Sequence, residues 1–273
     1  MWKRAKSNYD LESRAIAMRD LMGKVGESVA STKAHGNVRN IHAHGLFHKI
    51  FLHVCSAIQL RSGSLVGPDG LLVVDAASLF VVVRASVEAY LTFEYVFAEK
   101  GVAFESTLRY LVWWREGLLT RQRVAADLPD AAAVMKKEAM DLELNASAIR
   151  DNIEFEKVPP KRQKAILEEG KWRLSGWAAI ARKCGLSNMY SYRIYSYLSG
   201  FAHSESASVM QVLAMYKDSK EEELADNAVS FLLIVSAKMI RAFAAVFPDA
   251  WLVMSPQDRA FVDRWASGGS LGT

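Results

Sequence analysis

Residues 71–97 read LLVVDAASLFVVVRASVEAYLTFEYVF, and this stretch decides the fold. Apolar and aromatic residues fill almost all of it, which is typical of a helix that is buried on every side. Among the polar exceptions, Arg84, Glu88, Thr92 and Tyr95 recur every three or four residues and therefore share one face. The sequence predicts a core helix that carries a polar stripe into an apolar interior.

The rest of the chain has the same helical character, and strand signals are nearly absent. The four residues from Gly67 to Gly70, Gly-Pro-Asp-Gly, indicate a turn between two helices. Ser219 and Glu222 have the spacing of a capping box at the start of a late helix. Helices are expected at 8–30, 42–61, 70–99, 103–126, 130–151, 159–169, 175–184, 188–203, 219–247 and 256–266. The predicted fold class is all-α, a multi-helix bundle with long buried core helices.

Composition is compatible with a soluble core but does not identify a function. The 273 residues are 51% hydrophobic, which is enough to bury a substantial core. The net charge of +4 permits an anionic partner without requiring one. Cys55 and Cys184 form no CxxC motif and no disulfide framework, so a reducing cytoplasm is the expected location.

Charge and hydropathy suggest the domain organisation. Residues 1–40 are polar and are expected to form an N-terminal arm or helix. Residues 41–273 are expected to form a single all-helical domain, with residues 121–171 as a charged helical excursion. The richest apolar runs, Leu71–Val83 and Val229–Ala237, fall short of the roughly 20 residues that cross a bilayer. The sequence therefore predicts no membrane association.

A second polar stripe lies in residues 188–203, where Tyr192, Tyr195, Ser199 and His203 share one helical face. Burying charged and hydroxyl groups is costly unless they satisfy one another. The two stripes are therefore predicted to face each other and to line one polar site. Its candidate catalytic residues are Arg84, Glu88, Tyr195, Ser199 and His203.

Two classes of function fit such a site. In the first, a metal-independent enzyme or effector acts on a phosphate-bearing ligand such as RNA or a nucleotide. Arg84 would clamp the anion, Glu88 would orient Arg84 or His203, and His203 would move protons. Tyr195 and Ser199 would position the ligand. In the second, the same residues form a satisfied internal network in a non-catalytic interaction or oligomerisation module, and a homodimer is expected.

The motifs around these residues resemble a known family. Leu79–Glu88 reads LFVVVRASVE, and Tyr197–His203 reads YLSGFAH after the segment WAAIARKCGL at 177–186. These segments resemble bacterial proteins catalogued as domain of unknown function 5677, over about residues 42–215. The resemblance implies an all-helical domain in which the arginine, glutamate, tyrosine, serine and histidine positions converge. It implies no particular reaction.

A histidine-rich segment offers an alternative site. Arg39, Asn40 and His44 fit a pattern that resembles the catalytic signature of HEPN ribonucleases, which include toxins and phage-defence effectors. In that family the arginine holds the scissile phosphate and the histidine handles protons without a metal. His44 and His48 also have the spacing at which two imidazoles share a zinc ion. No Walker loop, Rossmann glycine fingerprint or paired-carboxylate cluster is present, so no cofactor is expected.

Overall fold

The computed structural model describes residues 6–32, 36–98, 103–125, 131–186, 194–203 and 205–268. Within these ranges almost all regular structure is helical, and the only sheet has two short strands. The predicted all-α class is therefore confirmed.

The chain divides into two compact units. The first comprises residues 1–94 and 177–273, and the second comprises residues 95–176. The elements of the first unit are α1 (Lys6–Ala30), α2 (Val38–Ser62), β1 (Ser64–Val66), β2 (Leu71–Val73), α3 (Ala76–Phe93), α8 (Trp177–Lys183), α9 (Tyr195–Ala202), α10 (Ser206–Asp218), α11 (Glu221–Val246), α12 (Asp249–Leu252) and α13 (Pro256–Gly268). The π-helix η2 (Glu94–Ala98) continues α3. The elements of the second unit are α4 (Ala103–Ala125), α5 (Ala132–Arg150), α6 (Ile153–Glu156) and α7 (Pro160–Glu169).

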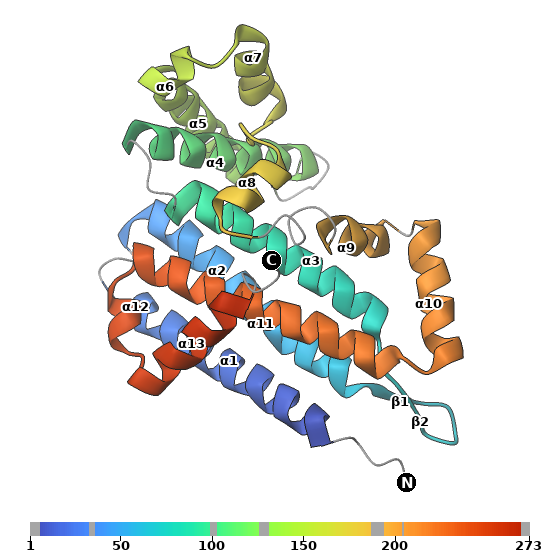
Figure 1. The fold of residues 1–273 in the computed structure, drawn as a ribbon. Coiled ribbons are helices and arrows are strands. Elements are labelled where there is room, and N and C mark those ends of the chain that lie inside the picture. Colours follow the sequence, from blue (N-terminus) through green and yellow to red (C-terminus); the bar gives the residue numbers. More distant parts are fainter. Residues whose placement is uncertain are drawn as a thin grey trace. The chain divides into compact units, whose positions relative to one another are not determined.

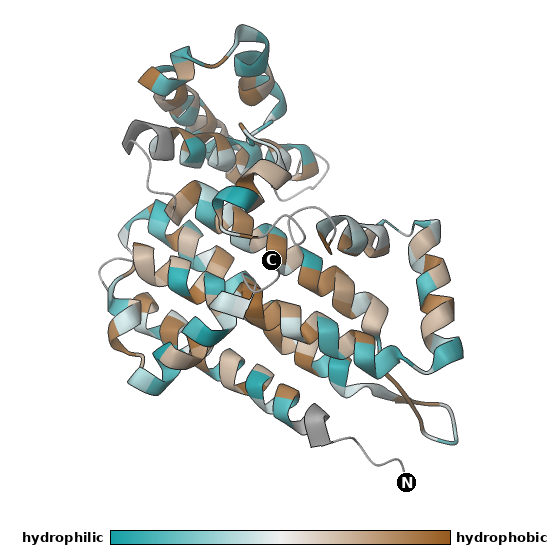
Figure 2. Cartoon of the chain, in the orientation of Figure 1, coloured by the Kyte–Doolittle hydropathy of each residue, from teal (hydrophilic) through white to brown (hydrophobic). Residues whose placement is uncertain are grey.

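The core of the first unit forms where α3 packs against both α2 and α11 (Figure 1). Leu79 and Val83 of α3 have no exposed surface, and Phe47 of α2 stacks on Phe243 of α11 with ring centroids 4.1 Å apart. The hydropathy colouring of Figure 2 is brown over much of α3. The apolar segment within residues 71–97 therefore forms the central core helix, as its pattern indicates.

Helix α1 forms part of this core, although residues 1–40 are polar overall. It contacts α2 and α11, and Met18, Met22 and Val25 lie on its fully buried face. Burial of that face offsets the cost of ordering the helix, which its propensity alone would not do.

The expected turn at Gly67–Gly70 has a different role from the one predicted. It closes a two-stranded antiparallel hairpin in which Leu65 pairs with Leu72, and Gly70 N–H donates to the Gly67 carbonyl at 3.3 Å. Strands of three residues are too short to show an alternating pattern, so the sequence does not reveal them.

Helix α10 is a second difference from the expected elements. Ser219 does not cap α11, because it ends α10 in a left-handed conformation with φ of 52°. The helix that follows begins at Glu221 and receives no side-chain cap from Lys220. The apolar residues of α10 point mainly into solvent, so no buried face marks the helix in the sequence.

The prediction of no membrane association is wrong in its premise. Two helices are long and apolar enough to cross a bilayer, Ala76–Ala98 with a mean hydropathy of 1.4 and Glu221–Val246 with 1.9. Uninterrupted apolar runs understate the length of these helices, because each helix continues through isolated polar residues. About 61% and 72% of these segments are buried in the protein, as also occurs in core helices of soluble proteins. The described structure likewise gives no support to the RNA, nucleotide or second copy predicted as partners.

The second unit has its own core, which forms where α4 packs against α5, α6 and α7. Buried Leu108, Val112, Ile149, Phe155 and Ile166 make up its centre. The charged segment at 121–171 lies within this unit.

Buried Arg115 ties three helices of the second unit together. Its Nε and Nη2 donate to the Leu167 carbonyl at 2.8 and 2.6 Å, and its Nη1 donates to the Leu142 carbonyl at 3.0 Å. Burial and the nearby charge of Arg150 lower the pKa of Arg115. The carbonyls therefore satisfy a guanidinium that would otherwise be costly to bury.

Candidate functional site

Arg84, Glu88 and Tyr195 meet where α9 packs on α3. Arg84 Nη2 lies 3.1 Å from Glu88 Oε1, and the Tyr195 hydroxyl donates to the same oxygen at 2.7 Å. The Arg84 guanidinium also lies 5.7 Å from the centroid of the Tyr195 ring, within cation–π range. The structure therefore brings together one member of the second polar stripe and two of the first.

The cluster is only partly shielded from solvent. The side chains of Arg84 and Glu88 are 18% and 33% exposed. Burial, followed by the hydrogen bond to Glu88, raises the pKa of Tyr195. The phenol is therefore a hydrogen-bond donor at neutral pH, and the carboxylate largely offsets the charge of Arg84.

Ser199 and His203 lie further along α9. Ser199 is half-buried, and His203 is exposed at the C-terminal cap of the helix. Eight residues of helix separate His203 from Tyr195, a rise of about 12 Å. Among the described contacts, the two residues are joined through the backbone, where His203 N–H donates to the Ser199 carbonyl at 3.1 Å. Tyr192 lies outside the described residues.

Thr92, a member of the first polar stripe, bonds to the backbone and does not join the polar cluster. The Thr92 hydroxyl donates to the Glu88 carbonyl at 2.7 Å, one turn earlier in α3. Hydroxyls in helices commonly make this bond, and it leaves Thr92 without a role in the polar cluster.

The alternative ribonuclease-like residues lie at the start of α2. Arg39 and Asn40 are half-buried in its first turns. The His44 ring nitrogen Nε2 lies 3.0 Å from the Gly26 carbonyl of α1, and its ring is 5.9 Å from that of Phe243. His44 is therefore held between helices of the core.

His48, the second imidazole of the possible zinc pair, is exposed and stacks on Phe51 at 5.6 Å. In the described part of the chain, His, Cys, Asp and Glu side chains form no group of three that could hold a metal ion. His35, at the start of the histidine-rich segment, lies outside the described residues.

A half-buried histidine outside the predicted sites, His53, lies against α3. His53 Nδ1 lies 2.9 Å from Ser86 Oγ, and Ser86 donates its own proton to the Val82 carbonyl at 2.9 Å. Nδ1 must therefore carry a hydrogen and donate it to Ser86. Burial, with a smaller effect of Lys49, lowers the pKa of His53 from 6.5 to about 4. The signal in the sequence is positional, since His53 follows buried Ile50 by three residues on the same face of α2.

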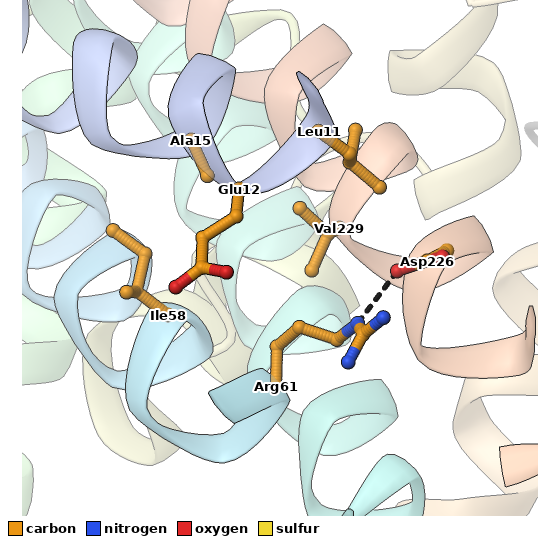
Figure 3. Close-up of a pocket in the computed structure, with 7 residues that line it drawn as sticks. All are labelled: Leu11, Glu12, Ala15, Ile58, Arg61, Asp226 and Val229. Carbon is orange, nitrogen blue, oxygen red and sulfur yellow. Dashed lines mark hydrogen bonds and ion pairs between the residues drawn. The ribbon is translucent and has the colours of Figure 1, made fainter. Parts of the chain in front are cut away.

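An ion pair that no sequence pattern indicates joins α2 and α11, as Figure 3 shows. Arg61 Nε donates to Asp226 Oδ1 at 2.5 Å, and Arg61 is only 12% exposed. Glu222 lies 3.7 Å from Arg61 Nη2. The adjoining cavity of about 20 Å³, between α1, α2 and α11, is the size of one water molecule. The site is therefore structural, because it is too small for an organic ligand.

A larger apolar groove runs between α3, α9 and α11. Its volume is about 300 Å³. The lining side chains are mostly aliphatic or aromatic: Phe80, Val83, Ile194, Tyr197, Leu198, Asn227, Ala228, Ser230, Phe231 and Ile234. We call this the α9–α11 groove. Tyr197 packs edge-on against Phe80 at 5.4 Å, so α9 forms a wall of the groove directly on α3.

Neither Arg84 nor His203 lines the cavity beside Arg61 or the α9–α11 groove. Comparison with protein-family models, with curated proteins and with solved structures found no match for this chain.

Proposed function

We propose that the first unit is a non-catalytic interaction module that binds an amphipathic, basic helix of a partner protein in the α9–α11 groove. The observation that carries the proposal is the position of α9. The Arg84–Glu88–Tyr195 cluster holds this helix on α3, and the same turn of α9 supplies Tyr197 and Leu198 to the groove wall. In this role the polar cluster is a positioning network.

The shape and chemistry of the groove support a helical occupant. An amphipathic helix binds by laying apolar side chains, spaced by one turn, into a hydrophobic groove between helices. Phe80, Phe231 and Ile234 offer such a surface. Helix α10, which packs on α9, carries further exposed apolar side chains, Val209, Met210, Leu213 and Tyr216, which are 49–70% exposed.

Charge favours a basic occupant. Glu223 precedes the groove residues Asn227 and Ser230 by four and seven residues, so all three share one face of α11. Glu221 adds negative charge in the same turn. An acidic rim beside an apolar groove complements lysines or arginines at the edge of a bound helix.

A binding assay with two synthetic peptides tests the proposal. One is an amphipathic helix of leucine and lysine, and the other carries glutamate in place of each lysine. The full chain should bind the lysine peptide, and added salt should weaken that binding. Asn227→Arg, which places a charge in the groove, should abolish binding, and Glu223→Lys should weaken it roughly tenfold.

The matched control is Asp263→Lys, the same charge reversal at a half-exposed surface pair of α13 with Arg241. It should bind the lysine peptide like the unaltered chain. Equal binding of both peptides, or unchanged binding by Asn227→Arg, would overturn the proposal. So would sedimentation showing that the groove is instead filled by a second copy of the chain.

A second candidate is the metal-independent enzyme acting on a phosphate-bearing ligand. One observation favours it: Arg84 Nε is buried without a hydrogen-bond partner in the described structure. The likeness to domain of unknown function 5677 and to HEPN ribonucleases belongs with this candidate and stays a prediction. The variant Arg84→Lys tests this candidate. It keeps the positive charge that pairs with Glu88 but loses the planar guanidinium, so turnover of the phosphate-bearing ligand should be abolished.

A further inference from the structure

The second unit contains an open polar groove of about 550 Å³. It lies between α4, the end of α7 and residues 171–176. Four basic side chains line it, Arg123, Arg162, Lys171 and Arg173, together with two acidic ones, Glu116 and Glu169. We call it the basic groove. Its volume falls within the range of small-molecule sites.

One wall of the basic groove is fixed in place by the packing of Gly170. This residue ends α7 in a left-handed conformation with φ of 70°. A Cβ atom here would lie 3.2 Å from the Cα of Glu116, so only glycine lets the end of α7 approach α4 this closely. The two helices therefore meet at a defined distance on the floor of the groove.

The segment after Gly170 is also anchored. The Trp172 ring lies 6.0 Å from the ring of Tyr95, and Leu174 N–H donates to the Tyr95 hydroxyl at 3.2 Å. Arg162 donates to the backbone carbonyl of Arg173. A wall held by such contacts loses little freedom when a ligand binds, which favours affinity.

Positive charges outnumber negative charges among the side chains that line the basic groove. Glu169 lies 2.6 Å from Lys171 Nζ, and this contact lowers the pKa of Glu169. Once that pair is set aside, three guanidinium groups share the groove with one carboxylate, Glu116. Glu116 accepts a hydrogen bond from the Thr120 hydroxyl at 3.1 Å, and Thr120 in turn accepts one from Arg123 at 3.0 Å. The charged side chains that line the groove therefore have a net positive charge.

We propose that the basic groove binds a compact polyanion that carries two or more phosphate groups. Guanidinium groups match phosphate oxygens in pairs, and the three arginines come from α4, α7 and the segment after α7. Such a ligand would bridge these elements. Trp172 forms part of the lining and therefore reports on occupancy. The proposal is independent of the helix-binding function of the first unit.

Titration of the full chain with inorganic tripolyphosphate tests this site, with tryptophan fluorescence and calorimetry as readouts. Binding should change the fluorescence, and Trp172→Phe should remove most of that change while calorimetry still detects binding. Arg123→Gln should weaken binding roughly tenfold. Arg162→Lys, which keeps the charge but loses the planar fork, should weaken it as well.

Lys161→Gln is the matched control, because Lys161 is an exposed neighbour of Arg162 on α7 and lies outside the groove lining. It should bind tripolyphosphate within about twofold of the unaltered chain. Absence of binding by the unaltered chain would overturn the proposal, as would equal weakening by Lys161→Gln. Melting curves of each variant separate lost binding from lost folding. Binding of the leucine–lysine peptide should be unchanged in Arg123→Gln, so the two proposals can fail separately.

Discussion

The hydroxyl of Tyr195 and the pairing nitrogen of Arg84 share a single carboxylate oxygen of Glu88. One acceptor atom therefore joins an ion pair within α3 to a hydrogen bond from α9. A partly buried pair of this kind contributes more to a defined helix position than to net stability, although removal of one partner is costly.

Tyr195→Phe should lower the free energy of unfolding by about 1–2 kcal/mol, because a hydrogen bond to a charged group is lost and Glu88 keeps only Arg84. Tyr197→Phe is the matched control on the same helix, since its hydroxyl bonds Gln211 at an exposed position. It should cost less than about 0.5 kcal/mol. Urea unfolding measures both, and equal losses would contradict the network.

His203→Ala should change the free energy of unfolding by less than about 0.5 kcal/mol, because the side chain is exposed. The same variant should bind the leucine–lysine peptide normally. Thermal melts and the peptide assay check this pair of outcomes. A destabilisation as large as that of Tyr195→Phe would show that His203 belongs to the internal network.

Asp226→Ala should destabilise the first unit by about 2–4 kcal/mol, since it removes the closer of the two carboxylates that pair with Arg61 in the described structure. The double variant Arg61→Met with Asp226→Leu should recover most of that loss, because it removes both charges and keeps apolar volume. Chemical denaturation of the single and double variants measures both free energies of unfolding. A double variant no more stable than Asp226→Ala would show that this ion pair cannot be replaced by apolar packing.

Acid should weaken the fold through His53. Its pKa is about 4 in the folded protein and near 6.5 when unfolded, so only the unfolded chain binds the proton between these values. The free energy of unfolding is therefore unaffected by His53 above pH 6.5 and falls as the pH drops toward 4. The loss is on the order of 1–2 kcal/mol for this partly exposed group. His53→Gln should flatten that part of the stability curve. An unchanged slope would assign the acid sensitivity to other groups.

The long helices could be predicted from sequence because their apolar patterns run for many turns. The stretch from Ala76 to Phe93 forms the core helix that its composition indicates, and the helix expected at 219–247 differs from α11 only near its ends. Elements without a buried face were missed. The hairpin at Ser64–Val73 and helix α10 expose most of their apolar side chains, so neither leaves a periodic signal.

The sites could be predicted only in part, because the residues that meet in each site are distant from one another in the chain. The facing stripes placed Tyr195 near Glu88, although 107 residues separate them. Spacing along α9 could not show that His203 lies beyond the contact with α3, because that depends on where the two helices cross. Arg61 and Asp226 are 165 residues apart, and no local pattern pairs them.

The pairing of α3 with α11 also bears on synthesis of the chain. Helix α3 is complete at Phe93, but α11 begins only at Glu221, after the whole second unit has been made. At ordinary elongation rates, the ribosome adds the intervening stretch in roughly ten seconds. During that delay one of the most hydrophobic helices of the protein lacks the part of its native cover that α11 provides, which makes the nascent chain a natural client for a chaperone.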